Sequence, residues 1–118
     1  MKKLNYKIID GGIMGNYRAI VHYTFNKGME DRGLKFLEDE LVKKAQDYGS
    51  HFIELWQNER DPRIIVGVAI WNDLEDARRF QGKWEGKEKE LTKLCSEAPK
   101  REFFKLKSTF AEKGKKAA

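Results

Sequence analysis

His22 and His51 are the only two histidines of this chain, and they are its first candidates for acid–base chemistry. His22 lies in the middle of an alternating apolar run, and a neutral imidazole can act as a general base near pH 7. The alternative is an ordinary histidine packed in a sheet. His51 begins a second strand-like run nearer the surface. We therefore take His22 as the candidate catalytic residue and His51 as a candidate ligand contact.

Three tryptophans can form the walls of a pocket for a flat aromatic molecule, because aromatic rings stack on one another. They are Trp56, Trp71 and Trp84. The alternative is that all three are plain core residues. Polar side chains would complete such a pocket, and each of the candidates also suits a solvated surface. These candidates are Glu54, Asn58 and Arg79.

The sequence contains no pattern that would bind a metal ion or a cofactor. The two histidines fall on different strands without carboxylates at ligand spacing, and there is no HExxH motif. Cys95 is the only cysteine, so no intramolecular disulfide can form and a reducing compartment is expected. We expect no cofactor and no metal.

The formal charge of +5 is concentrated at the two ends of the chain. Residues 1–10 and 111–118 each carry a net charge of +2, which leaves +1 for the body. Within the body the signs alternate, as in EDELVKK and KEKELTK, a pattern typical of solvated helix faces. No long apolar segment occurs. We expect a cytoplasmic protein without nucleic-acid or membrane partners.

Apolar spacing predicts six elements that would position these residues. We expect Asn72 to cap the second helix, with Glu75 as the second half of a capping box, and Pro99 to end the helical region. The order β-α-β-β-α-β is that of a ferredoxin-like sandwich, an α+β fold with one antiparallel sheet. The expected elements are strands over 17–25, 51–58, 63–71 and 101–108, and helices over about 30–48 and 73–98.

The third strand is apolar on both faces. Ile64, Val66, Val68 and Ile70 point one way, and Ile65, Gly67, Ala69 and Trp71 point the other way. Leaving a large aliphatic side chain in water forgoes about 1.5–3 kcal/mol. We therefore expect a homodimer in which a second copy covers the face without helices. The alternative is that residues 1–16 fold over that face.

Three segments carry a resemblance to a known family: YRAIVHYTFNKGMED, YGSHFIELWQNERDP and IIVGVAIWNDLEDARRF. Together they resemble the dimeric α+β barrel superfamily, and within it the antibiotic biosynthesis monooxygenase-like domains. The resemblance implies a barrel domain over 17–110, preceded by an extension or edge strand over 1–16 and followed by a basic tail over 111–118. It also implies a pocket between a subunit's sheet and its helices.

Members of that family include cofactor-independent oxygenases, which implies such an activity here on an aromatic or polycyclic substrate. The alternative is a non-catalytic dimeric module that binds a small ligand. Haem-degrading members have a histidine on the second helix, about ten residues after the tryptophan that ends a strand. Counting from Trp71, this chain has Phe80, Gln81 and Gly82 there. Haem degradation is therefore not expected.

RNA-recognition domains share the β-α-β-β-α-β order, but they need exposed aromatic residues on the third strand to stack on bases. The corresponding run here, RIIVGVAI, is aliphatic. RNA binding is accordingly not expected.

Overall fold

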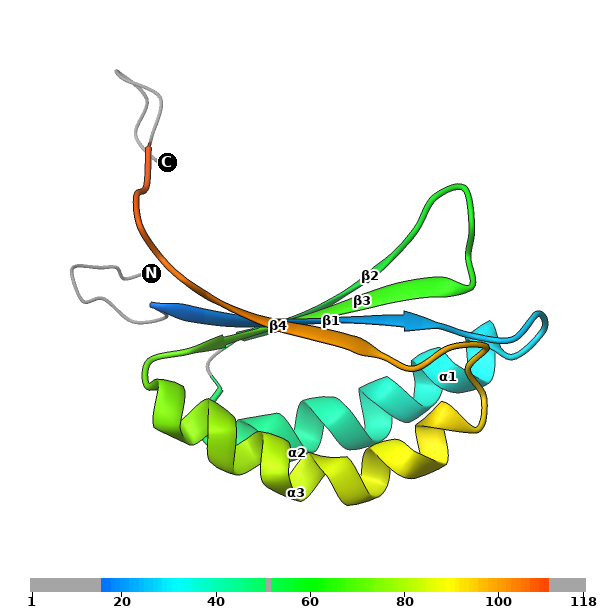
Figure 1. Ribbon diagram of the computed structural model, residues 1–118, viewed down its shortest axis with the longest axis horizontal. Coiled ribbons are helices and arrows are strands. Elements are labelled where there is room, and N and C mark those ends of the chain that lie inside the picture. Colours follow the sequence, from blue (N-terminus) through cyan, green and yellow to red (C-terminus); the bar gives the residue numbers. More distant parts are fainter. Residues whose placement is uncertain (1–15, 51, 111–118) are drawn as a thin grey trace.

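The computed structural model of the protein describes residues 16–50 and 52–110, which form two layers (Figure 1). One layer is a four-stranded antiparallel sheet with the order β2-β3-β1-β4, and the helices lie against one of its faces. The expected ferredoxin-like α+β fold is confirmed, with the first and third strands in the centre. The elements are β1 Tyr17–Thr24, α1 Glu30–Phe36, η1 Leu37–Leu41, α2 Val42–Asp47, β2 Phe52–Gln57, β3 Ile64–Trp71, α3 Leu74–Thr92 and β4 Lys100–Lys105.

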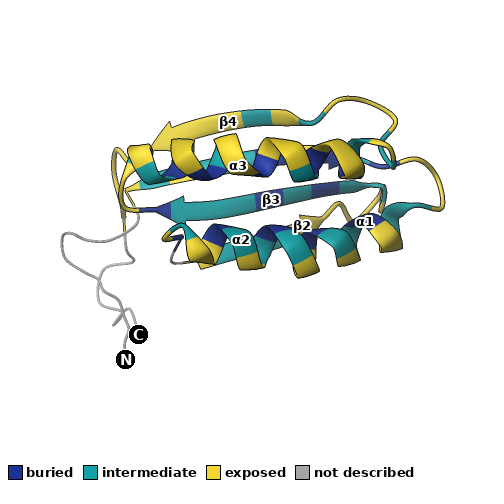
Figure 2. Cartoon of the chain, turned by 90° about the horizontal axis from the view of Figure 1, so that it is seen from below, coloured by how far each residue is buried: buried dark blue, intermediate teal, exposed yellow. Residues whose placement is uncertain are grey.

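The hydrophobic core lies between the sheet and the helices. Alternation along β1 and β3 directs every second side chain towards the helices, and α3 contributes residues at helical spacing. In Figure 2 the buried residues of the helices lie on the side that faces the sheet, whereas most of β4 is exposed. The largest fully buried side chains are Trp71, Trp84, Tyr23, Phe25, Leu37, Ile65 and Leu91.

The first helical region is continuous from Glu30 to Asp47, with the π-helical turn η1 between α1 and α2. Gly49 follows it with φ 102°, a left-handed conformation that favours glycine after a helix. Near the start of the region, Gly33 is buried against the ring of Phe25. This close approach brings α1 onto the end of the sheet.

The cap of α3 differs from the prediction. Asp73, not Asn72, is the N-cap, and its Oδ1 accepts a hydrogen bond of 2.9 Å from the backbone N–H of Glu75. The backbone of Asp73 is still extended, with φ −129° and ψ 124°, so the helix begins only at Leu74. The Asp73 carboxylate also complements the positive end of the helix dipole.

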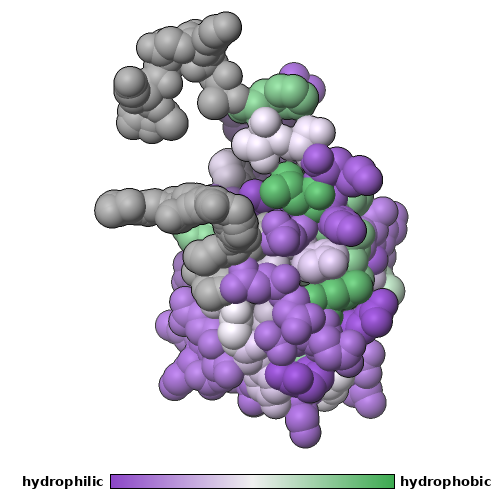
Figure 3. All heavy atoms as spheres, turned by 90° about the vertical axis from the view of Figure 1, so that its left-hand side faces the viewer, coloured by the Kyte–Doolittle hydropathy of each residue, from purple (hydrophilic) through white to green (hydrophobic). Residues whose placement is uncertain are grey.

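The second face of the sheet has no helix against it (Figure 1). In Figure 3, apolar side chains gather in the upper part, on the sheet side, while the helix layer below is mostly hydrophilic. Phe52 is 51%, Trp56 59% and Phe104 49% exposed. Across β2, β3, β1 and β4 in turn, three rows of this face are Phe52, Ile70, Arg18 and Phe104; Glu54, Val68, Ile20 and Glu102; and Trp56, Val66, His22 and Lys100.

Some predictions fall on residues outside this description. Of the expected N-terminal extension the structure describes only Asn16, and the basic tail and His51 also lie outside the described residues. Within the described residues, no helix combines the length and the apolar character needed to cross a membrane.

Candidate functional site

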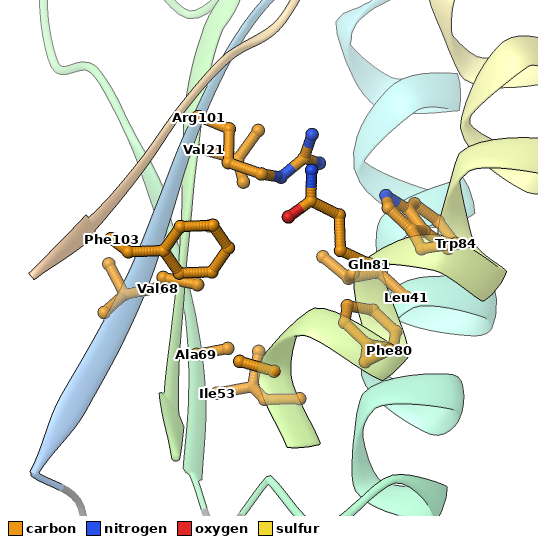
Figure 4. A pocket seen from close by; sticks show the side chains of 13 residues that line it. Val21, Leu41, Ile53, Val68, Ala69, Phe80, Gln81, Trp84, Arg101 and Phe103 are labelled. Atoms are coloured by element: carbon orange, nitrogen blue, oxygen red, sulfur yellow. The ribbon is translucent and has the colours of Figure 1, made fainter. Parts of the chain in front are cut away.

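A small cavity of about 30 Å³ lies between the sheet and α3 (Figure 4). Its floor is made by the small residues Ala19, Gly67 and Ala69 of the two central strands, which leave space below α3. This volume holds about two water molecules, whereas pockets for drug-sized ligands measure roughly 300–1,000 Å³. The cavity is therefore too small to admit a ligand unless it becomes larger.

Aromatic rings and two polar side chains complete the cavity wall. Phe80 and Trp84 of α3 stack with ring centroids 6.1 Å apart, and Phe103 enters from the edge strand β4. Gln81 and Arg101 are the polar residues that line the same space. The wall thus combines flat apolar surfaces with side chains that can form a hydrogen bond.

A buried polar cluster adjoins this wall, and Glu88 is its centre. The Oε2 atom of Glu88 accepts hydrogen bonds from Tyr23 Oη at 2.8 Å, Trp84 Nε1 at 3.0 Å and Arg101 Nη2 at 2.6 Å. These donors come from β1, α3 and β4, so the cluster joins the edge strand to the helix. The expectation that KEKELTK forms a solvated helix face is wrong for Glu88, which is 8% exposed. It faces the sheet because it lies one helical turn after the buried Trp84.

Burial and the neighbouring Glu88 carboxylate raise the pKa of Tyr23 above its ordinary range. Tyr23 therefore stays a protonated donor at neutral pH. Glu88 and Arg101 form a salt bridge, with 11% and 17% of their side chains exposed. The cluster combines one negative and one positive charge, and it presents no net charge to the cavity.

The thiol of Cys95, which lies beside this cluster, has a raised pKa. Burial first, and the Glu88 carboxylate second, raise the pKa of its thiol from 9.0 to about 11. As the pH rises, the thiol ionises at lower pH in the unfolded chain than in the folded protein, and this favours unfolding. Relative to higher pH, the folded state therefore has its full stability below about pH 9 and loses the contribution of Cys95 between pH 9 and 11. Because the pKa of Tyr23 is also raised, the folded state loses stability through this residue as well when the pH rises above 10.0.

We expect a Cys95→Ala variant to lose less stability than the wild type between about pH 8 and pH 10. Urea unfolding midpoints at these two pH values measure the difference. Parallel pH profiles for the two proteins would contradict the raised thiol pKa.

Trp71 lies one layer behind the cavity, at the end of β3. It is fully buried, and its ring centroid is 5.5 Å from that of Phe80. Its Nε1 is a buried donor without a hydrogen-bond partner in the described part of the chain. An unsatisfied buried N–H is unfavourable by about 1–3 kcal/mol. An acceptor atom placed beside Trp71 would remove that penalty.

Of the other predicted ligand contacts that the structure describes, some lie at the cavity and some lie away from it. Trp84 lines the cavity, but Trp56 lies on the opposite face of the sheet, where its Nε1 donates to Glu54 at 3.0 Å. Asn58 accepts hydrogen bonds from Arg60 and Asp61 in the turn before β3. Arg79 pairs with Asp76 at 2.7 Å on the exposed side of α3.

His22 also lies on the face of the sheet opposite the cavity. It is exposed on β1, where it is level with Lys100 of β4, and both line an open hollow of about 550 Å³, lined mostly by polar and charged residues, at that end of the sheet. In the described part of the chain, no cluster of three or more histidine, cysteine or acidic side chains could hold a metal ion. Any chemistry of His22 would therefore take place away from Trp84.

Comparison with known proteins finds similarity in structure but none in sequence. No family model matches the sequence, and no curated protein matches it. A monooxygenase of Streptomyces coelicolor in complex with the ligand nanaomycin D superposes with a TM-score of 0.70 and 14% identity, covering 84% of this chain and 93% of that one.

Two further solved structures share the fold. An antibiotic biosynthesis monooxygenase superposes with a TM-score of 0.69 and 12% identity, covering 78% of this chain and 99% of that one. A dimeric ferredoxin-like protein from an uncultured marine organism superposes with a TM-score of 0.67 and 13% identity, covering 87% of this chain and 96% of that one. The chain therefore has the ferredoxin-like fold of antibiotic biosynthesis monooxygenase-like proteins, which confirms the resemblance in fold.

Proposed function

We propose that the protein binds a small, flat, apolar molecule between its sheet and α3, in an enlarged form of the cavity. The observation that carries this proposal is the cavity wall. Small residues on the central strands face the stacked rings of Phe80 and Trp84, and Gln81 and Arg101 lie beside them. An apolar pocket with a few converging polar groups is the usual form of a small-molecule site.

Phe103 is the residue that has to move to admit such a ligand. It is 38% exposed and belongs to β4, which is an edge strand and is therefore free to shift along its outer side. If its ring turns outwards, the space that it leaves joins the cavity of about 30 Å³. The ligand's ring would then take the place of the Phe103 ring beside Phe80.

A Gly67→Ala substitution tests the binding site without disturbing the fold. Its new Cβ would lie 3.5 Å from Leu55 Cδ2 and 3.6 Å from Leu41 Cδ2, which are ordinary contacts. We expect the free energy of unfolding to rise by about 0.5–1 kcal/mol, because alanine loses less backbone entropy than glycine. We expect the affinity for 1-naphthol to fall by about tenfold or more, a loss of about 1.4 kcal/mol, measured by calorimetry.

Gly82→Ala is the matched control. Its Cβ would meet nothing within 4 Å, on the exposed side of α3, so it should stabilise the helix and leave ligand binding unchanged. If both variants bind 1-naphthol as the wild type does, the proposed site is incorrect.

Oxidation of the bound molecule by O₂ is the second candidate function, favoured by the two monooxygenases among the structures that share this fold. In such a reaction a phenol with a free para position and O₂ would give a quinone and water. Among the described residues that line the cavity, Arg101 is the one ionisable side chain, and a guanidinium is not a base near pH 7. The predicted base, His22, would act from the other face of the sheet.

Oxygen uptake with 1-naphthol separates the two candidates. Uptake that is lost in His22→Ala would support catalysis at the sheet face, and uptake that is lost in Gly67→Ala would support catalysis in the cavity. If 1-naphthol binds but none of these proteins consumes oxygen, the protein has only the ligand-binding function.

We also propose that the protein is a homodimer through the sheet face that lacks helices. Phe52, Trp56 and Phe104 are each about half exposed on that face, and the aliphatic side chains of β3 lie between them. A stable interface buries roughly 800 Å² per partner. The dimeric ferredoxin-like protein from the marine organism shows that this fold is found in dimers.

Ile20→Lys should convert the dimer into a monomer. Ile20 lies in the middle row of the face, level with Val68, and a buried lysine without a partner would strongly disfavour association. Light scattering at several concentrations measures the mass, with Lys83→Glu on the exposed side of α3 as the control. A wild-type protein that stays monomeric at high concentration would rule out the dimer.

A further inference from the structure

We propose that the cavity selects an uncharged ligand with an acceptor oxygen, and that Glu88 is the residue that determines this selectivity. The proposal rests on the binding function proposed above and adds the chemical class of the ligand. Glu88 does not line the cavity, so it acts through Arg101, which does. Glu88 is in this sense a positioning and specificity residue, not a catalytic one.

The position of Arg101 is fixed by the buried cluster. Its Nη2 donates to Glu88 Oε2 at 2.6 Å, and the same oxygen is held by Tyr23 and Trp84. Figure 4 shows the Arg101 side chain reaching from β4 into the space between the sheet and α3, which Gln81 enters from the helix. The guanidinium is therefore held in one orientation at the edge of the cavity.

The charge of this pair is balanced before any ligand binds. Among the described residues that line the cavity, Arg101 is the one that carries a charge, and the carboxylate of Glu88 neutralises it. An anionic ligand would bring an uncompensated negative charge close to Glu88, in a site where little water remains to solvate it. Burying an unpaired charge is strongly unfavourable.

Hydrogen-bond donors nevertheless remain for a neutral ligand. A guanidinium carries five N–H groups, and the bond to Glu88 uses one of them, while the amide of Gln81 can supply another donor. A carbonyl, ether or hydroxyl oxygen can accept these bonds without adding charge. If Glu88 were not charged, Arg101 would instead favour carboxylates or phenolates, which it can bind bidentately.

Two probes of the same shape test this selectivity on the wild-type protein. Naphthalene-2-carboxamide is neutral at pH 7.5, and 2-naphthoate is an anion. We expect calorimetry to give an affinity for the carboxamide about tenfold higher or more, since desolvating the anion is not compensated. Tighter binding of the naphthoate would overturn the inference and leave the binding function intact. If neither probe binds, the proposed function fails, and the inference fails with it.

A Glu88→Gln variant should weaken or abolish this preference. Its amide oxygen still accepts hydrogen bonds from Tyr23 and Trp84, but the charge of Arg101 is no longer balanced. We expect the ratio of the two affinities to shift by about tenfold or more towards the naphthoate. If Glu88 has only a structural role, both affinities fall equally and the ratio stays unchanged, which would overturn the inference.

Glu85→Gln is the matched control, because it removes the same charge from the exposed side of α3 and should leave the ratio unchanged. Circular dichroism shows whether Glu88→Gln folds. If it does not fold, Arg101→Gln provides the second variant. In this variant the negative charge of Glu88 has no positive partner, so the ratio of the carboxamide affinity to the naphthoate affinity should increase. A decrease in this ratio would overturn the inference.

Discussion

Replacing Arg101 with methionine should lower the free energy of unfolding by about 3–5 kcal/mol. The substitution keeps most of the unbranched apolar stem of the side chain but leaves the Glu88 carboxylate buried without its positive partner, at a position that is 8% exposed. It also removes the ion pair that ties β4 to α3. The measurement is the urea unfolding midpoint and its slope at neutral pH.

The double variant Glu88→Gln/Arg101→Met separates the charge effect from lost packing. It contains no buried charge, and the Gln amide oxygen still accepts hydrogen bonds from Tyr23 and Trp84. We expect it to recover about 2 kcal/mol relative to Arg101→Met alone, because neutral polar groups are far less unfavourable to bury than unpaired charges. A double variant no more stable than the single one would show that Arg101 stabilises the fold by packing.

Gly33→Ala is expected to lower the free energy of unfolding by about 1–3 kcal/mol, although alanine is the better helix former. A Cβ at this position would lie 2.7 Å from Phe25 Cδ1 and closer still to Cε1 and Cζ. Phe25 is fully buried, so its ring can move only by displacing the core around it. The midpoint of thermal or urea unfolding measures the loss.

Gly86→Ala is the control for the helix propensity itself. Its Cβ would meet nothing within 4 Å, so we expect a gain of about 0.5–1 kcal/mol. Replacing Phe25 with leucine should be less unfavourable in the Gly33→Ala background than in the wild type, because the smaller side chain relieves the overlap. Equal effects in both backgrounds would mean that Gly33 and Phe25 do not restrict each other.

The arrangement of the strands could be predicted from the sequence because its causes are local. Hydrophobic spacing predicts the order of the strands and helices along the chain, and the first and third strands lie in the centre of the sheet as that order implies. The cap of α3 was placed one residue too early. Both Asn72 and Asp73 are good capping residues, and the extended backbone of Asp73 decides between them.

The candidate site could be predicted only in part. Trp84 was recognised as an aromatic residue on a helix face, but nothing in the sequence distinguished it from Trp56, which lies across the sheet from the cavity. The sequence pattern does not indicate Arg101 or Gln81 as site residues, and it predicts a solvated face around Glu88. Its spacing of four residues from Trp84 was the one available signal that it points inwards.

The sequence alone therefore determined the class of fold, since hydrophobic periodicity acts over a few residues and can be seen along the chain. Tertiary structure decided which residues form the site, because Glu88 meets Tyr23 from 65 residues away and Arg101 from 13 residues away. Such contacts depend on how β1, α3 and β4 pack together. They turn a residue with the pattern of a surface glutamate into the centre of a buried polar cluster.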